Sequence, residues 1–489
     1  MLRKVLVLFY IVTLVFMRFW NVGNTARFTR DESYDIVKLH QYWKEKKITL
    51  VGAIDYTGYL VYSSLTYYTM MPFAVIGNFE PVSTVYAFSF AGVITVFFIY
   101  LIAKLVNKEK LWLILLLALF WFPLLQASRW SWNPYFLPFS LSIAFYLFLR
   151  GTGLFSGGLS VPKKKFERRG KLFLFFSGIF FGAAFHYHYI SFITSGSFLI
   201  LYTIYDYLKR RKFLVVWTWA GLVSMIIPFV IFDLRHPPGL FFTGYLKSNM
   251  VSQGFSGELG RLIISLPQII FKMALFLSGV KLVTIIVILA ISAVLISDIK
   301  SKNLIAEILF LPLILQLLVI SFLPTFETRY FLPALIPLLI WLLIKRKGVI
   351  DLVTKSIIFL LILGNLFVVN KTLFTTAKPS PKVVGNVANY IAGKIEEEDL
   401  KNVNIAVLSS PDPDPLGAVY RDVLLSKEIR LLPTSEYDIS DSLFVVSTSS
   451  ESIVRNDPAN VINGFRDGPL DESYLLRNSE WRVYLFKRY

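Results

Sequence analysis

The sequence predicts a polytopic α-helical membrane protein that carries a small α/β domain at its C-terminus. Of the 489 residues, 55% are apolar and only 17% are charged, whereas soluble domains contain about 25% charged residues. The mean hydropathy is +0.60. Apolar stretches long enough to cross a bilayer, which takes about 20 residues, recur as far as residue 370. These observations exclude an ordinary cytosolic enzyme, a disordered chain and a coiled coil.

Eleven apolar stretches are predicted to span the membrane, namely 5–20, 84–106, 112–127, 133–150, 172–190, 191–208, 213–232, 281–298, 303–323, 329–345 and 350–370. The first follows Arg3 and Lys4 and lacks a good cleavage site, so we favour an uncleaved span over a signal peptide. Lys and Arg cluster in alternate loops, which the positive-inside rule places in the cytoplasm together with the N-terminus. Segments 59–77, rich in Tyr, and 262–279, with Lys272 at its centre, are expected to be interfacial helices on the outer face.

The charge distribution indicates a lipid bilayer as a partner and no nucleic acid. Lys and Arg outnumber Asp and Glu by 50 to 32, a net charge of +18. Residues 379–489 hold 12 basic and 17 acidic residues, so the excess of positive charge lies in the short loops between the apolar stretches. Cys is absent and there are four His residues, which excludes disulfides and thiol nucleophiles and disfavours a His-rich metal site.

Eleven spans place the C-terminus outside the cell and divide the chain into two parts. Residues 1–370 form the membrane module, with a first external loop at about 21–82 and a long external loop at about 233–280. Residues 371–489 form an extracytoplasmic α/β domain. Its predicted helices and strands are Val383–Ile395, Val403–Leu408, Leu416–Leu425, Leu443–Val446 and Trp481–Lys487.

Nothing in the C-terminal part of the chain has the pattern of a catalytic site. Asp412-Pro413-Asp414-Pro415 is interpreted as a rigid turn, because proline fixes the backbone at alternate positions. The search for chemistry therefore concentrates on the external loops of the membrane module.

Asp31 and Glu32 open the first external loop, just after the first span. A carboxylate pair at a membrane surface can serve as a general base or hold a divalent cation. The structural alternative is a solvated helix start that Asp31 caps. His186 and His188, at the outer end of the fifth span, are also candidates for ligand binding, with a hydrogen-bonded structural histidine as the alternative.

Three arginines are predicted to lie on the same face as Asp31. Arg129 precedes the fourth span, Arg235 ends the seventh and Arg329 opens the tenth. The positive-inside rule disfavours arginine at outward ends of spans, so these residues call for a reason. A guanidinium binds phosphate in a bidentate manner, and a phosphate site is therefore predicted. Lipid headgroup contacts, or a local ion pair such as Asp233–Arg235, are the alternative.

The order of these clusters resembles that of the GT-C membrane glycosyltransferases, in particular the group of the dolichyl-phosphate-mannose protein mannosyltransferases and the ArnT-like enzymes. The likeness covers about residues 1–370. The segments that carry it are Asp31-Glu32, Tyr67-Tyr68, Ser128-Arg129-Trp130-Ser131-Trp132-Asn133-Pro134, His188-Tyr189, Phe232-Asp233-Leu234-Arg235-His236 and Arg329-Tyr330-Phe331-Leu332-Pro333. Segment 59–77 departs from the pattern of the group in two respects. The Gly-Pro that precedes the tyrosines in bacterial members is absent, and so is the second acid that ArnT-like enzymes carry near a metal.

The resemblance implies roles for these residues. Asp31 would be the general base, and Glu32 would orient it. The donor phosphate would meet Arg329, Arg235 and Arg129. A divalent cation, held by Asp31 and the nearest substitute acid, Asp55, is left open as a cofactor. Residues implied in substrate binding are Tyr67, Tyr68, His188, His236 and Tyr330.

The resemblance further implies an inverting hexosyl- or pentosyltransferase of the cell membrane. It would transfer a sugar from a polyprenyl phosphate to a protein, lipid or glycan acceptor. Three other interpretations are retained: an oligosaccharide ligase or polymerase that uses a polyprenyl diphosphate, a lipid-linked sugar flippase or transporter, and a scaffold that displays the tail. The spans carry few charges at mid-depth, which disfavours a transporter, because transporters place ionisable groups there.

Overall fold

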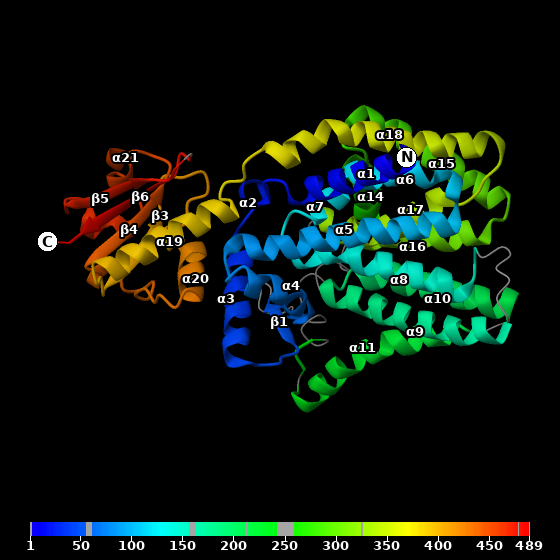
Figure 1. The fold of residues 1–489 in the computed structure, drawn as a ribbon, viewed down its shortest axis with the longest axis horizontal. Helices are drawn as coiled ribbons and strands as arrows, with labels where there is room; N and C mark the ends of the chain where they lie inside the picture. Colours follow the sequence, from blue (N-terminus) through cyan, green and yellow to red (C-terminus); the bar gives the residue numbers. More distant parts are fainter. Residues whose placement is uncertain are drawn as a thin grey trace.

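The computed structural model describes residues 2–54, 61–155, 163–211, 213–237, 239–241, 259–323, 326–477 and 479–488. A bundle of helices and a small sheet domain lie next to each other along the long axis of the molecule (Figure 1). We call the end of the bundle that contacts the sheet domain the domain end, and the opposite end the far end.

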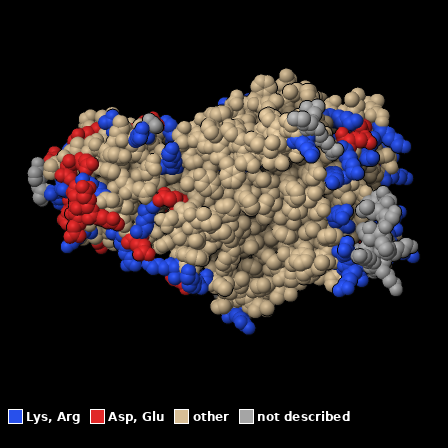
Figure 2. Space-filling model, in the orientation of Figure 1, with Lys and Arg blue, Asp and Glu red and all other residues tan. Residues whose placement is uncertain are grey.

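Within these described ranges, seven helices are long and apolar enough to cross a membrane. They are α1 (Leu2–Phe19), α5 (Pro81–Val106), α9 (Lys163–Tyr187), α11 (Val216–Arg235), α15 (Lys281–Lys300), α16 (Leu304–Ser321) and α18 (Gly348–Phe374). Many of their outward side chains, such as Phe9 and Leu289, are exposed and apolar. Figure 2 shows a broad region without charge across the visible face of the bundle. The chain is therefore an integral membrane protein.

Each of the other four predicted spans consists of two shorter helical pieces. These are α6 (Leu111–Phe120) with α7 (Phe122–Ala127), η2 (Asn133–Phe136) with α8 (Leu137–Thr152), α10 (Ser191–Tyr205) with the π-turn η3 (Asp206–Arg210), and η4 (Thr328–Ala334) with α17 (Leu335–Leu343). At the break between α6 and α7, the Phe122 backbone N–H donates to Asn365 Oδ1 at 2.8 Å. Such side-chain bonds satisfy the backbone groups that a broken helix leaves unpaired in lipid.

Basic residues gather at the far end of the bundle, as Figure 2 shows. The short helix η1 (Lys108–Lys110) lies there, and Lys110 pairs with Asp351 at 3.0 Å. Arg346 likewise pairs with the buried Asp298 at 2.7 Å. The basic loops of Lys110 and Arg346, which the sequence analysis assigns to the same side of the membrane, therefore lie together at the far end.

Short helices and a hairpin cover the domain end. They are α2 (Val22–Thr25), α3 (Arg30–Glu45), the antiparallel strands β1 (Val51–Ile54) and β2 (Val61–Ser63), α4 (Leu65–Ile76) and α14 (Leu259–Ser278). In α14, Ser265 Oγ donates to the Ser321 carbonyl at the end of α16, and the Leu277 carbonyl accepts from Trp121 Nε1. The first half of α14 thus contacts the end of α16, and its C-terminal end contacts the break between α6 and α7.

The C-terminal domain begins after α18 and contains a four-stranded mixed sheet in the order β3-β4-β6-β5. Strands β3 and β4 are parallel, and the other neighbours are antiparallel. The elements are α19 (Pro381–Glu397), β3 (Val403–Val407), α20 (Ala418–Ser426), η5 (Tyr437–Ile439), β4 (Ser442–Ser447), α21 (Glu451–Arg455), η6 (Asn460–Phe465), β5 (Leu470–Leu475) and β6 (Arg482–Lys487). The predicted helices and strands are confirmed. Strand β5 was missed because its mostly exposed side chains give no apolar alternation.

The two faces of this sheet pack against different partners. Ile405 and Phe444 point to the face that α19 and α20 cover, and this core continues into the membrane bundle. Ala406 and Val445, one residue later on the same strands, belong to a separate core with Phe465. This alternation follows from the two-residue period of a strand. Helix α20 packs against α3, so the domain touches the external loop that carries Asp31.

Candidate active site

A cavity of about 590 Å³ lies between the domain end of the bundle and the C-terminal domain. Its walls come from segments about 400 residues apart in the sequence. The lining residues are Arg27, Phe28, Thr29, Arg30, Asp31, Glu32, Trp130, Trp132, Tyr135, Glu327, Thr328, Pro379, Val407, Asp412, Pro413, Asp414, Pro415, Ala418, Val419, Tyr420 and Trp481. The volume is in the range of pockets that bind small organic ligands, about 300–1,000 Å³.

Glu32 fixes the start of α3 against the bundle. The backbone N–H and the hydroxyl of Thr29 both donate to Glu32 Oε2 at 2.6 Å, and Trp130 Nε1 donates to Oε1 at 2.7 Å. Burial raises the pKa of Glu32, while these three hydrogen bonds oppose the shift. Because both of its oxygens accept hydrogen bonds, Glu32 holds the start of α3 against the bundle.

Asp31 is the reactive candidate among the residues at the helix start. Its side chain is exposed and lines the cavity, as do Arg27 and Arg30. In the part of the chain that the structure describes, its carboxylate makes no hydrogen bond or ion pair. The helix holds this carboxylate in place, and its oxygens make no hydrogen bonds to the described chain. Such a carboxylate can accept a proton from a bound hydroxyl.

Asp35, one helical turn after Asp31, is a buried carboxyl group that the sequence reasoning missed. The Tyr67 hydroxyl donates to Asp35 Oδ1 at 2.8 Å. Burial raises the pKa of Asp35 well above its usual range. Tyr67 thus braces α3 against α4 and does not line the cavity. The i, i+4 spacing of the two aspartates was the sequence signal for this second carboxyl group.

Aromatic rings connect Glu32 to Arg329. Trp130 stacks on Trp132 with centroids 5.1 Å apart and planes at 22°. The Arg329 guanidinium lies over Trp132 at 4.3 Å, and Arg27 lies over Trp130 at 6.0 Å. Arg329 is not itself a lining residue, but it packs on Trp132, and its neighbours Glu327 and Thr328 line the cavity, which places it at the cavity edge. Its buried Nε has no partner in the described chain.

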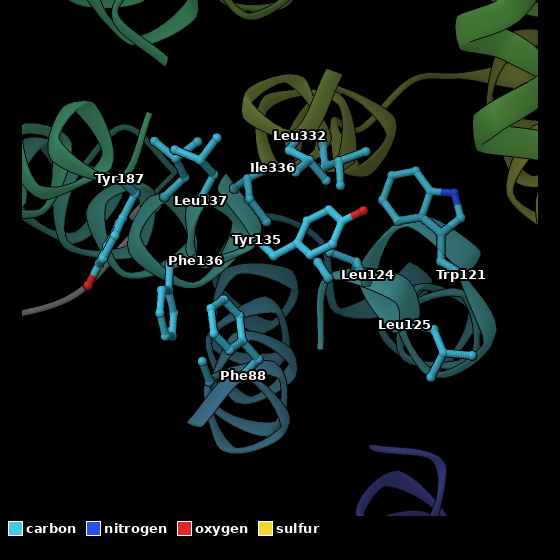
Figure 3. Close-up of a cluster of buried hydrophobic side chains, with 14 of the residues drawn as sticks. Phe88, Trp121, Leu124, Leu125, Tyr135, Phe136, Leu137, Tyr187, Leu332 and Ile336 are labelled. Carbon is cyan, nitrogen blue, oxygen red and sulfur yellow. The ribbon is translucent and has the colours of Figure 1, made fainter. Parts of the chain in front are cut away.

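A dense core of aromatic and aliphatic side chains supports this edge. Phe88 of α5 and Phe136 of η2 stack at 4.0 Å, and Phe136 packs against Tyr187 at 5.0 Å. Figure 3 shows these rings together with Tyr135, Leu332 and Trp121. Because η2 and η4 both join this core, the Trp130–Trp132 turn and Arg329 are held by the same packing.

Arg129 does not reach the cavity. Its terminal nitrogens donate to the Met17 carbonyl at 3.0 Å, the Trp20 carbonyl at 2.7 Å and the Thr25 hydroxyl at 2.6 Å. These contacts satisfy carbonyls at the end of α1, where the helix leaves them unpaired. The structure thus gives Arg129 a structural position, and its two terminal nitrogens are already engaged.

Arg235 and His236 also lie away from the cavity. Both are exposed at the end of α11. His236 stacks on Phe232 at 4.3 Å, and Asp233 Oδ1 accepts from the backbone N–H groups of Leu240 and Phe241. The segment forms a capped helix end, and the structure does not bring it together with Asp31.

His188 and Tyr330 lie beside Arg329, whereas Tyr68 does not. The His188 and Tyr330 rings are 6.1 Å apart, and Arg329 is 5.5 Å from the Tyr330 ring. The Tyr330 hydroxyl is buried without a partner in the described chain. Tyr68 instead exchanges hydrogen bonds with the backbone of Thr49 at 2.7 and 2.8 Å. The structure therefore brings together three of the predicted binding residues behind Trp132.

The described residues contain no group of three or more His, Cys, Asp or Glu side chains that could hold a metal ion. Asp55, predicted as a ligand, lies outside the described residues. Glu32, the acid next to Asp31, has no free oxygen. Of the two predicted ligands, Asp31 is thus the one that the structure describes, and a cation at this site stays a prediction.

The C-terminal domain supplies one wall of the cavity, which the sequence did not predict. The segment Asp412–Pro415 was expected only as a rigid turn, yet it faces the cavity together with Tyr420 and Trp481. No periodicity or motif reveals this placement, because it depends on how the domain docks on α3. Ser33 Oγ of α3 donates to Asp422 Oδ2 of α20 at 2.8 Å across that contact.

No family model and no curated protein matches the chain. Its structure is similar to that of ArnT from Cupriavidus metallidurans bound to undecaprenyl phosphate, with a TM-score of 0.57 and 13% identity, over 98% of this chain and 97% of that one. It is also similar to the Archaeoglobus fulgidus oligosaccharyltransferase in the apo form, with a TM-score of 0.50 and 10% identity, over 85% of this chain and 63% of that one. The same oligosaccharyltransferase tethered with an acceptor peptide gives a TM-score of 0.50 and 11% identity, over 87% and 63%. The expected fold is confirmed, and the chain has the GT-C fold of membrane glycosyltransferases.

Proposed function

We propose that this protein is a membrane glycosyltransferase that moves a sugar from a polyprenyl-phosphate donor to an acceptor hydroxyl. The observation that carries the proposal is the free carboxylate of Asp31 in a cavity at the domain end, with Arg329 at the cavity edge. The GT-C fold supports the proposal, and so does the similar ArnT structure, which is described as bound to undecaprenyl phosphate.

The proposed reaction is one inverting displacement. Asp31 accepts the proton of the acceptor hydroxyl while the hydroxyl oxygen attacks the anomeric carbon of the donor sugar. The bond between that carbon and the phosphate oxygen breaks, and the polyprenyl phosphate leaves with the electron pair. Arg329 stabilises the negative charge that grows on the leaving phosphate, and its packing on Trp132 holds it ready. Glu32 and Trp130 keep the helix that carries Asp31 in position.

The reaction is proposed to take place on the extracytoplasmic side of the cell membrane, with the N-terminus in the cytoplasm. Support comes from the basic residues at the far end of the bundle, where the positive-inside rule expects the cytoplasm (Figure 2). The cavity opens at the other end, next to the C-terminal domain. The polyprenyl chain of the donor would then remain in the bilayer while its phosphate reaches Arg329.

The test uses purified full-length protein in nanodiscs with a panel of polyprenyl-phosphate sugars and a panel of polyprenyl-diphosphate sugars. Release of the free lipid phosphate is followed for the wild type, Asp31→Asn and Asp35→Asn. We expect consumption of a monophosphate donor that Asp31→Asn abolishes and Asp35→Asn preserves, because Asn at position 35 still accepts from Tyr67. Full activity of Asp31→Asn would refute the mechanism, and consumption of diphosphate donors alone would reassign the protein to the ligases.

Two further variants in the same experiment test which arginine binds the donor phosphate, with Arg329→Ala as the test and Arg235→Ala as its control. Arg329→Ala should weaken binding of the donor and of free polyprenyl phosphate, because the cation at the cavity edge is removed. Arg235→Ala should leave both unchanged, since Arg235 is exposed on α11 and does not line the cavity. The reverse result would move the phosphate site to the end of α11.

A further inference from the structure

The wall that the C-terminal domain gives to the cavity has the features of a ligand site. The turn contains proline at positions 411, 413 and 415, which fixes the backbone and removes three N–H donors. Asp414 anchors the turn: its carboxylate accepts from the backbone N–H of Ala418 at 2.5 Å, and its backbone bridges to Val407. The turn is thus stiff, and one of its two acids is committed to holding it.

Asp412, the other acid of the turn, is exposed and lines the cavity. Within the described ranges its carboxylate has no hydrogen-bond or ion-pair partner. Asp31 lies in the opposite wall, on the membrane module. The cavity therefore presents one free carboxylate from each part of the chain, and each is an acceptor for hydroxyl donors.

Tyr420, in the first turn of α20, provides a second and independent sign of a ligand. Its side chain is 2% exposed and lines the cavity, and its hydroxyl has no partner among the described residues. A buried hydroxyl that makes no hydrogen bond costs free energy, so such groups are rare and call for a partner. A ligand in the cavity would supply that partner.

The remaining lining residues indicate the chemistry of this ligand. Trp130, Trp132 and Trp481 offer aromatic surfaces, against which the C–H faces of sugar rings can pack. Two arginines and five carboxylates line the cavity, and two of the carboxylates, those of Glu32 and Asp414, are engaged internally. The acidic excess disfavours an anionic ligand at this wall and fits the hydroxyl groups of an uncharged saccharide.

We propose that the cavity binds an uncharged acceptor saccharide, whose hydroxyl groups donate to Asp412 and pair with the Tyr420 hydroxyl. The inference rests on the proposed glycosyltransferase function and adds the class of acceptor to it. The C-terminal domain then presents the acceptor to Asp31, and the donor phosphate stays near Arg329. Acceptor and donor contacts are thereby assigned to different parts of the chain.

The test uses full-length protein in nanodiscs, with undecaprenyl phosphate as the lipid probe. Methyl glycosides of glucose, mannose, galactose and N-acetylglucosamine, and methyl glucuronide as the anionic counterpart, are titrated by calorimetry and tryptophan fluorescence. We expect at least one neutral glycoside to bind more tightly than the glucuronide. Asp412→Asn and Tyr420→Phe should each weaken that binding about tenfold, the factor for one hydrogen bond of this kind. Asp467→Asn, an exposed acid that lines no described cavity, should leave it unchanged.

The outcomes separate this inference from the proposed function. Binding of undecaprenyl phosphate without any glycoside binding, or equal binding by all variants, would overturn the acceptor site and leave the donor site standing. Stronger binding of the glucuronide than of every neutral glycoside would also overturn it. Failure to bind the lipid phosphate and the glycosides would remove both proposals.

Discussion

Replacing Trp130 with Phe tests whether the hydrogen bond to Glu32 positions α3, the helix that carries the proposed base Asp31. Phe keeps an aromatic ring next to Trp132 but lacks the Nε1 donor that lies 2.7 Å from Glu32 Oε1. A hydrogen bond to a charged group contributes about 1.5–3 kcal/mol, so we expect the free energy of unfolding to fall by about 2 kcal/mol. The two bonds from Thr29 remain, so α3 should stay helical while its start loosens against the bundle.

Trp130→Phe should affect the rate of sugar transfer more than it affects the stability of the fold. A displacement of about 1 Å at a reacting group can reduce the rate about a hundredfold, and Asp31 is the neighbour of Glu32. We therefore expect Trp130→Phe to lower kcat strongly and to change donor KM little. The assays are thermal unfolding and sugar transfer in nanodiscs, with Trp112→Phe as the control, because Trp112 is 47% exposed on the bundle. An unchanged midpoint together with wild-type kcat would refute the positioning role.

Two further predictions concern stability. Burial raises the pKa of Asp35 well above the usual value of about 4, so the stability that this acid contributes at low pH is lost as pH rises through its folded pKa. At pH 4, Asp35→Asn and the wild type should unfold at the same temperature. At pH 8, Asp35→Asn should unfold at a higher temperature than the wild type. Equal unfolding temperatures of the two proteins at both pH values would contradict this. In the bundle, a methyl group at Gly178 would collide with the Thr218 carbonyl on α11, whereas one at Gly393 in α19 would meet nothing within 4 Å. Gly178→Ala should destabilise by about 1–3 kcal/mol and Gly393→Ala should stabilise by about 1 kcal/mol, as chemical unfolding would measure.

The membrane architecture could be predicted because hydropathy is a local property of the chain. Each of the eleven predicted spans coincides with helical chain, and seven helices have the length and apolarity to cross alone. The alternation of basic loops likewise matched the charge at the far end. What the sequence did not reveal was the break in four spans, as at Trp121, where side chains such as Asn365 satisfy the freed backbone groups.

The candidate site, like the membrane architecture, could be predicted from the sequence only in part. Asp31 and Arg329 could be proposed from the sequence because both stand at predicted outer ends of spans and both lie in segments that resemble those of the GT-C group. The sequence could not separate Arg329 from Arg129 and Arg235, since all three occupy equivalent places at span ends. Only the packing shows that Arg129 binds backbone carbonyls and that Arg235 is exposed at the end of α11 and does not line the cavity.

By itself the sequence determined that the chain crosses a membrane, and it pointed to the loop after the first span as the place of a candidate catalytic carboxylate. These properties follow from composition and period along a few neighbouring residues. The tertiary structure decided which side chains meet. It paired Glu32 with Trp130 across 98 residues and brought Asp412 and Tyr420 of the C-terminal domain to the cavity of Asp31. Such contacts depend on how helices pack and domains dock, and no local pattern in the chain encodes them.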